Sequence, residues 1–448
     1  MDQDASDYWD FDEESPDDGF SPDEDQADFL RNLGLFPGYD PAQIPHEEQL
    51  AQIATDICDE WLSFISKNRQ SPQKILNLLE DISDYVIAAV NTKGDHREKV
   101  IRLGLSLRSD YWLSRGMWKR WRDTLMPVLK TALSLPNYEL VTEAYRQWGI
   151  FLYLSSAQDG SQIAFNTAIE YAETSKDPRL SLMAHAERLN AQAAQLPRLE
   201  VEAQATAILA SARGQNNVFV MGRVYLTLAR TYAHQNLYTE NFMAAQQAFL
   251  YFARAGNSEY VLSALSQMIS ALSYQYQDTY SPHYKQHLLR VYRAVAKNSA
   301  SPHFQANVYH YQGFLCFQKQ NYQQARSYII RAWSKQWSLR QYFNCAIEIH
   351  MLGMIESKRK NWLLAEQLFT TAIKRYHKLG NRVKGVQARY ARAYLPFEKQ
   401  DFEAAVSQLE AVLPFARQIE EQAVRDQLIA DIQADIDAAR RNLVQAPV

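Results

Sequence analysis

The feature that most limits what this chain can fold into is an internal repeat with a period of forty residues. In each copy, apolar residues flank a small residue, and a row of apolar positions containing alanines follows. The matching positions are Tyr309, Gly313, Cys316, Ala325, Ile329 and Ala332; Ile349, Leu352, Gly353, Trp362, Ala365, Phe369 and Ala372; and Arg389, Ala393, Phe402, Ala405, Leu409 and Val412. A repeat of this length predicts stacked supersecondary units rather than one globular core.

The pattern resembles the tetratricopeptide repeat, W-x2-L-G-x2-Y followed by A-x3-F-x2-A, in which two antiparallel helices pack through small residues. The longer period resembles the forty-residue subclass found in kinesin light chains, bacterial peptide-sensing regulators and the sensor halves of signal-transduction ATPases. Leu78–Val90 and Lys99–Leu133 also resemble the junction that follows the nucleotide-binding module of those ATPases. No G-x-x-x-x-G-K-[ST] loop is present, so the resemblance implies a sensor half without the ATPase.

Projection of the glycine position backwards extends the array toward the start of the chain. With one four-residue insertion near Asp278–Pro282, the equivalent positions are Ile269, Ala229, Leu189, Gly149 and Ser109. The resemblance then implies an all-α fold, a right-handed α-solenoid of about eight helix pairs with helical caps. The expected domains are a disordered acidic arm (1–45), an N-terminal helical cap (46–100), the repeat array (101–415), and a C-terminal capping helix and tail (416–448).

Composition agrees with helices joined by short connections. Glycine and proline are scarce, at 15 each among 448 residues, and 47% of the chain is hydrophobic, which excludes wholesale disorder. The three cysteines are far apart and form no C-x-x-C motif. We find neither a signal peptide nor a run of 18 apolar residues. A cytoplasmic protein without membrane insertion is therefore expected.

Negative charge is concentrated at the start of the chain. Residues 1–30 contain thirteen Asp and Glu and no Lys or Arg, which leaves 38 acidic and 47 basic residues in 31–448. The aromatic residues Tyr8, Trp9 and Phe11 lie within this acidic arm, a pattern typical of disordered segments that dock through a few apolar contacts. We expect the arm either to occupy the chain's own groove until a partner displaces it, or to recruit a separate basic partner.

The resemblance also implies a binding surface. In tetratricopeptide arrays the first helix of each pair faces a concave groove, at positions three before and one and four after the glycine position. The candidate groove residues in this chain are Arg146, Tyr153, Asn190, Arg230, Ser270, His310, Phe314, His350, Tyr390 and Tyr394. Such side chains can stack on and hydrogen-bond a peptide. The alternative is a tight superhelix whose interior packs on itself.

The function favoured by these observations is a non-catalytic adaptor or regulatory module that binds a protein or peptide in its groove. We find no catalytic constellation and no metal-ligating cluster, so we expect no enzymatic activity, cofactor or metal. The alternative is a nucleic-acid-associated regulator that uses basic helix faces. Its candidate residues are Arg115, Lys119, Arg120, Arg122, Lys358, Arg359 and Lys360. Nucleic acid is the less favoured partner because the neighbouring tryptophans fit the repeat register.

Overall fold

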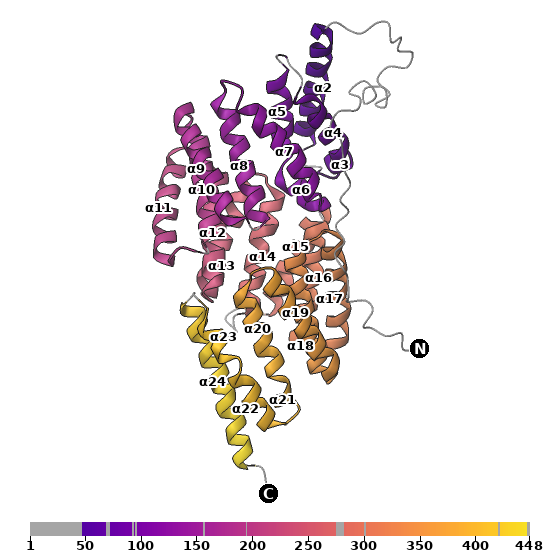
Figure 1. Cartoon of the computed structure of the whole chain (residues 1–448), viewed down its shortest axis with the longest axis vertical. Coiled ribbons are helices and arrows are strands. Elements are labelled where there is room, and N and C mark those ends of the chain that lie inside the picture. Colours follow the sequence, from indigo (N-terminus) through magenta and orange to yellow (C-terminus); the bar gives the residue numbers. More distant parts are fainter. Residues whose placement is uncertain are drawn as a thin grey trace, which may run out of the picture. The chain divides into compact units, whose positions relative to one another are not determined.

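The chain is α-helical throughout its described part. A computed structural model describes residues 47–68, 72–91, 94, 96–155, 157–193, 195–274, 282–299, 302–419 and 422–445. These residues contain no strand, and those from Ala51 onward belong to one compact unit. Consecutive helices pack against each other along this unit (Figure 1). The predicted all-α solenoid of repeated helix pairs is therefore confirmed.

Helices of unequal length, from 6 to 21 residues, precede a regular array of helix pairs. The described helices before residue 135 are α2 (Glu47–Lys67), α3 (Pro72–Asn77), α4 (Leu79–Ala89), α5 (Arg97–Ser106), α6 (Ser109–Arg115) and α7 (Trp118–Ala132). The pairs that follow are α8 (Tyr138–Leu154) with α9 (Gln158–Ser175), α10 (Pro178–Gln192) with α11 (Arg198–Gly214), α12 (Val218–His234) with α13 (Tyr238–Arg254), α14 (Ser258–Tyr274) with α15 (Pro282–Ser299), α16 (Pro302–Gln318) with α17 (Tyr322–Ser338), and α18 (Tyr342–Lys358) with α19 (Trp362–Lys378).

The forty-residue period has a simple structural origin. Helices α12, α13 and α14 have 17 residues each, and three-residue turns separate them. Two such helices with two such turns make one repeat. The predicted four-residue insertion falls where expected, because α14 and α15 are separated by 275–281 instead of three residues.

The turns share one local chemistry. Their middle residue adopts a left-handed backbone conformation, which reverses the chain directly after a helix. These residues are Asn216, Asn236, Gly256, Gln320, Arg340, Lys360, Gly380 and Gln400. The next residue is often Asn or Asp, whose side chain caps the following helix. Asn381, for example, accepts a hydrogen bond from the Lys384 backbone nitrogen at 2.9 Å.

Small residues let paired helices approach closely. A Cβ atom placed on Gly353 would lie 2.7 Å from the ring of Phe369 on the partner helix, and one on Gly149 would lie 2.7 Å from Phe165. Both glycines occupy the small position that the repeat pattern identified. The phenylalanine rings fill the space left by the missing side chain, so this crossing depends on the Gly–Phe combination.

The first repeat departs from the regular pattern. Its first helix is broken at Leu107–Arg108 into α5 and α6, whereas the first helices α8, α10 and α12 are continuous. α5 packs against α4, α7 and α8, whereas α6 contacts α3 and α16 in addition to α7 and α8. Gly116, left-handed with φ of 66°, lies so close to Leu339 that a Cβ would approach its carbonyl oxygen to 2.9 Å. α6 thus bridges two distant parts of the array.

The C-terminal end continues the register with proline interruptions. In the last pair the first helix is divided into α20 (Arg382–Ala393) and α21 (Leu395–Glu398), and the second helix is divided into α22 (Phe402–Glu410) and α23 (Leu413–Arg417). Helix α24 (Gln422–Gln445) packs against α22 and α23. Its buried residues Leu428, Ile432 and Ile436 recur every four residues and form one apolar face over the last pair.

Candidate functional site

A cavity of about 1150 Å³ lies among the first helices of the repeats. Its walls come from α8, α10, α12 and α14, with α6, α7, the start of α16 and the turn between α17 and α18 completing them. Pockets for small molecules usually measure 300–1,000 Å³, so this volume suits a larger ligand such as a short peptide.

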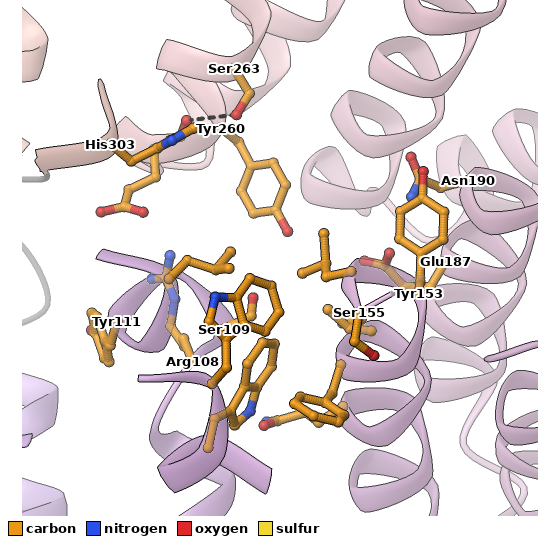
Figure 2. A pocket seen from close by; sticks show the side chains of 18 of the residues that line it. Arg108, Ser109, Tyr111, Tyr153, Ser155, Glu187, Asn190, Tyr260, Ser263 and His303 are labelled. Carbon is orange, nitrogen blue, oxygen red and sulfur yellow. Dashed lines mark hydrogen bonds between the residues drawn. The ribbon is translucent and has the colours of Figure 1, made fainter. Parts of the chain in front are cut away.

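Polar side chains meet in this cavity from three directions (Figure 2). Tyr153, Ser155, Glu187 and Asn190 lie on the side formed by α8 and α10. A second side carries Arg108, Ser109 and Tyr111 from α6 and its N-terminal cap. Tyr260, Ser263 and His303 come from α14 and α16, and the Tyr260 hydroxyl points into the space between these groups. The segment that follows the break between α5 and α6 therefore supplies part of the cavity wall.

A buried ion cluster lines the side formed by the repeats. The Glu187 carboxylate accepts hydrogen bonds from Arg223 Nε at 2.9 Å and Nη2 at 2.6 Å, and both side chains are less than a tenth exposed. Arg146 lies 3.9 Å from Glu187 and donates two hydrogen bonds to Glu143 at 2.7 and 2.6 Å. Burial by itself raises the pKa of Glu187, but the guanidinium charges of Arg223 and Arg146 hold that pKa below its ordinary value.

Arg230 lies beside this cluster but has different partners. Its Nη1 donates a hydrogen bond to Asn190 Oδ1 at 2.9 Å. No carboxylate of the described residues lies within 4.0 Å of its guanidinium. Burial and the like charge of Arg223 lower the pKa of Arg230. The cavity therefore contains a partly buried cation whose charge no direct ion pair offsets.

Aromatic rings form the apolar part of the cavity wall. Trp121 contacts Phe151 edge-on with ring centroids 5.1 Å apart, and Trp118 lies 6.0 Å from Trp121. On the opposite side, Phe219 contacts Tyr260 at 5.3 Å, and the Arg223 guanidinium lies 5.1 Å from the Tyr260 ring centre. Such a combination of rings and charged groups can hold apolar and polar parts of one ligand together.

The structure divides the ten predicted groove residues into two sets. Arg146, Tyr153, Asn190 and Arg230 line the cavity together. The remaining six, on α14 and beyond, lie outside it. Ser270 Oγ is 3.3 Å from the Tyr311 hydroxyl, and Phe314 is partly buried on α16. The binding roles of all ten stay predictions.

The other four of those six residues also have polar or aromatic partners within the array. His310 Nδ1 lies 3.0 Å from the buried Glu348 carboxylate. His350 packs edge-on against Phe369 and Tyr376. The Tyr390 hydroxyl donates to Asp435 of α24, and Tyr394 stacks on Phe397 with centroids 4.9 Å apart. In this half of the array, these predicted groove residues make contacts of the kind expected for an interior that packs on itself.

Sequence reasoning missed the residues that complete the cluster. Glu187 lies two positions before the glycine position of its repeat, and Glu143 and Arg223 lie six before it, whereas the predicted positions were three before and one and four after. The available signal was a Glu and an Arg on neighbouring first helices, at positions where most repeats carry uncharged residues. Nothing in the sequence pattern indicated that α6 would turn back onto the cavity.

The basic groups considered for nucleic acid are largely engaged with protein oxygen atoms. Arg120 pairs with Asp84, and Arg122 with Asp123. Lys358 pairs with Glu398 at 2.5 Å, and Arg359 with Glu356 at 2.9 Å. Such pairs reduce the positive charge that these helix faces present to a phosphate backbone.

Three further predictions concern the acidic arm, metal binding and membrane insertion. The acidic-arm residues Tyr8, Trp9 and Phe11 lie outside the described residues, so the docking of the arm stays a prediction. No group of three or more His, Cys, Asp or Glu in the described ranges has the arrangement of a metal site. Across the same part of the chain, each helix is too short or too polar to cross a bilayer.

Comparisons with known proteins give structural similarity alone. No known protein family matches the sequence, and no curated protein does. A Rap protein complexed with competence and sporulation factor is 12% identical over 88% of this chain and 99% of its own, with a TM-score of 0.42. A signal-transduction ATPase with a tetratricopeptide repeat sensor, from Pyrococcus horikoshii, is 13% identical over 79% of this chain and 55% of its own, with a TM-score of 0.47. Yeast Tom70 is 12% identical, covers 88% of this chain and 97% of its own, and has a TM-score of 0.23.

Proposed function

We propose that this chain is a non-catalytic adaptor or regulatory module that binds a protein or peptide segment in the cavity formed by α6, α8, α10, α12 and α14. The observation that carries the proposal is the cavity itself, about 1150 Å³, with four predicted groove residues on its wall. Its lining combines aromatic rings with charged and amide side chains that are held in place by hydrogen bonds. These are the properties of a site that holds an extended chain through both side-chain and backbone contacts.

The test fills the cavity without disturbing the array. Ser263 lines the cavity, and its hydroxyl bonds to the Glu259 carbonyl one turn earlier. Ser211 makes the same kind of bond to Ala207 but lies exposed on α11. Ser263→Trp is expected to abolish retention of peptides from a synthetic random hexapeptide library, whereas Ser211→Trp is expected to retain them like the unmodified chain.

Two results would contradict the proposal. One is that the unmodified chain retains no peptide from the library. The other is that Ser263→Trp retains the same peptides with the same affinities while its melting temperature shows that it is folded. The nucleic-acid alternative predicts instead a strongly salt-dependent binding of oligonucleotides that the cavity substitution leaves unchanged.

A further inference from the structure

Positive charge is concentrated in one part of the array. Residues 282–378 contain 15 Lys and Arg but three Asp and Glu, whereas the rest of 31–448 contains 32 basic and 35 acidic residues. Two of the three acids, Glu348 and Glu356, are 1% exposed and pair with histidine or arginine side chains of the array. The third, Glu366, lies in the first half of α19. The positive charge of this segment is therefore largely uncompensated at its surface.

The second helices of three successive pairs carry most of this charge. α15, α17 and α19 contain ten of the 15 basic residues, whereas the corresponding earlier helices α9, α11 and α13 contain three Arg and six Asp or Glu. Contacts through α16 and α18 join the three basic helices into one part of the array (Figure 1). Most of their basic side chains lie in the second half of each helix, so they gather on the side where these helices end.

We call this surface the basic face. Its members are exposed or partly exposed Lys and Arg of α15, α17, α19 and the turn after α17: Arg290, Arg293, Lys297, Arg331, Lys335, Arg340, Lys374, Arg375 and Lys378. In contrast to the paired basic groups described above, no carboxylate of the described residues lies within 4.0 Å of the charged groups of Arg331, Arg340 or Lys374. A surface of this kind attracts polyanions, because neighbouring like charges add to one potential.

Aromatic rings lie among these charges. The Trp337 ring stacks on Trp333 with centroids 5.8 Å apart, contacts Tyr342 at 5.7 Å, and has the Arg375 guanidinium 5.1 Å from its centre. Tyr342 and its neighbour Phe343 begin α18 and are 41% and 39% exposed. They lie where the basic face meets the rim of the cavity. Exposed rings beside unpaired cations are the combination that single-stranded nucleic acids use, through base stacking and phosphate contacts.

We propose that the basic face binds a single strand of nucleic acid, with phosphates at its Lys and Arg side chains and bases stacked on Tyr342 and Phe343. This activity is additional to peptide binding, and the charged members of the face other than Arg340 lie outside the cavity lining. A duplex hides the faces of its bases, and an acidic peptide offers carboxylates without a flat partner for the rings. A single strand satisfies both the charges and the rings.

The experiment measures the binding of a labelled thymidine oligonucleotide, about twelve nucleotides long, to the full chain by fluorescence anisotropy at several salt concentrations. The combined variant Arg331→Gln, Arg340→Gln and Lys374→Gln is expected to weaken binding at least about tenfold at low salt. The slope of log affinity against log salt should also become shallower by about 2, because each phosphate contact of a single strand contributes about 0.7.

The turns at the two ends of α18 supply a matched control. Arg340 and Lys360 are both left-handed turn residues, and Gln320 and Gln400 occupy the same position in other repeats, so glutamine fits there without strain. Arg340→Gln is expected to weaken binding and reduce the salt slope by about 0.7. Lys360→Gln, at the opposite end of α18, is expected to leave both unchanged. Equal effects of the two substitutions would reduce the interaction to a response to net charge and would contradict the proposal.

The rings are tested separately from the charges. Tyr342→Ala combined with Phe343→Ala is expected to weaken the oligonucleotide roughly fivefold to a hundredfold with an unchanged salt slope, whereas Tyr342→Phe keeps the ring and should bind normally. Ser263→Trp, which fills the cavity, is expected to bind the oligonucleotide like the unmodified chain. Failure of this inference is thereby distinguishable from failure of the proposed function, which is measured with peptides.

Four outcomes would overturn the inference. One is the absence of oligonucleotide binding at low salt. A second is tighter binding of a duplex of the same length, or of a polyglutamate peptide, than of the single strand. A third is an alanine variant of both rings that is folded, by its melting temperature, and binds with unchanged affinity. The fourth is binding of phosphatidylserine vesicles, lost in the combined charge variant, by a chain that does not bind the oligonucleotide.

Discussion

At the scale of single residues, the cavity is defined by charges that the fold holds in place. Glu187 is the central group, because it contacts Arg223 directly and lies 3.9 Å from Arg146. Breaking a buried ion pair by removing one partner is costly, since the other charge stays buried without compensation. Glu187 is therefore a structural requirement of the cavity as well as part of its wall.

Replacement of this carboxylate should destabilise the protein. Glu187→Gln leaves the buried guanidinium of Arg223 without its counter-charge, whereas Arg146 keeps its contact with Glu143, and we expect a loss of about 3–5 kcal/mol in the free energy of unfolding, measured with urea. The matched control is Glu202→Gln on α11, whose partly exposed pair with Arg198 at 3.7 Å should contribute less than about 1 kcal/mol. Equal losses in the two variants would show that the buried cluster contributes no more to stability than the ion pair of the control does.

Two histidines at the same register of successive repeats should respond to pH in opposite ways. Burial lowers the pKa of His310, but the charge of Glu348 and the hydrogen bond to it outweigh this, so the pKa is raised above 6.5. His350 is partly buried beside Phe369 and Tyr376 with Lys384 nearby, and burial together with that lysine's charge lowers its pKa to about 3. His310 is thus stabilised in its charged form and His350 in its neutral form.

The opposite pH dependences of stability expected from His310 and His350 can be checked with single substitutions. Below pH 6.5 the unfolded chain protonates His350 while the folded chain does not, so the folded state should lose stability as pH falls from 7. Relative to His350→Gln, the free energy of unfolding of the unmodified protein should fall by roughly 2 kcal/mol between pH 7 and pH 4.5. The contribution of His310, measured against His310→Gln, should instead be largest below pH 6.5 and decrease as pH rises. Urea unfolding across this range measures both slopes, and slopes of the same sign would refute the assignment.

At the scale of elements, the repeat register carried most of the predictive power. Helix pairs, their period and the insertion between α14 and α15 follow from matching small and apolar positions, since the close crossing of two helices restricts which residues fit. The break between α5 and α6 could not be predicted in this way. Trp112 and Tyr111 keep the apolar character that the register demands, yet both are buried on a helix that contacts α3 and α16. Long-range packing, which the local pattern does not encode, decides the direction of α6.

The helix crossing at Gly353 offers a direct test of this explanation. Gly353→Ala places a Cβ against the Phe369 ring and should cost about 1–3 kcal/mol of unfolding free energy, as overpacked sites do. In Gly214→Ala, at the end of α11, the new Cβ meets no atom within 4 Å. That variant should be neutral or up to about 1 kcal/mol more stable, because alanine favours helix. A similar result for both glycines would show that close approach is not what selects Gly353.

At the scale of the whole molecule, the two parts of the array use their first helices differently. Around α8, α10 and α12 these helices line a cavity with charged and aromatic groups, and α6 adds a wall from outside the regular register. From α16 onward the corresponding residues are engaged with neighbours, such as His310 with Glu348 and Tyr390 with Asp435. Peptide binding is therefore expected in the earlier repeats, while the first helices of the later repeats support the array.

The most direct measurement is to locate a bound peptide by photo-crosslinking. A benzophenone side chain replaces Tyr153 on the cavity wall or, as the control, Ile163, which is 67% exposed on α9 and does not line the cavity. Each variant is irradiated with the tightest hexapeptide from the library, and adducts are identified by mass spectrometry. We predict adducts at position 153, reduced by an excess of unlabelled peptide, and none at position 163. Adducts at position 163 alone, or equally at both positions, would contradict binding in the cavity.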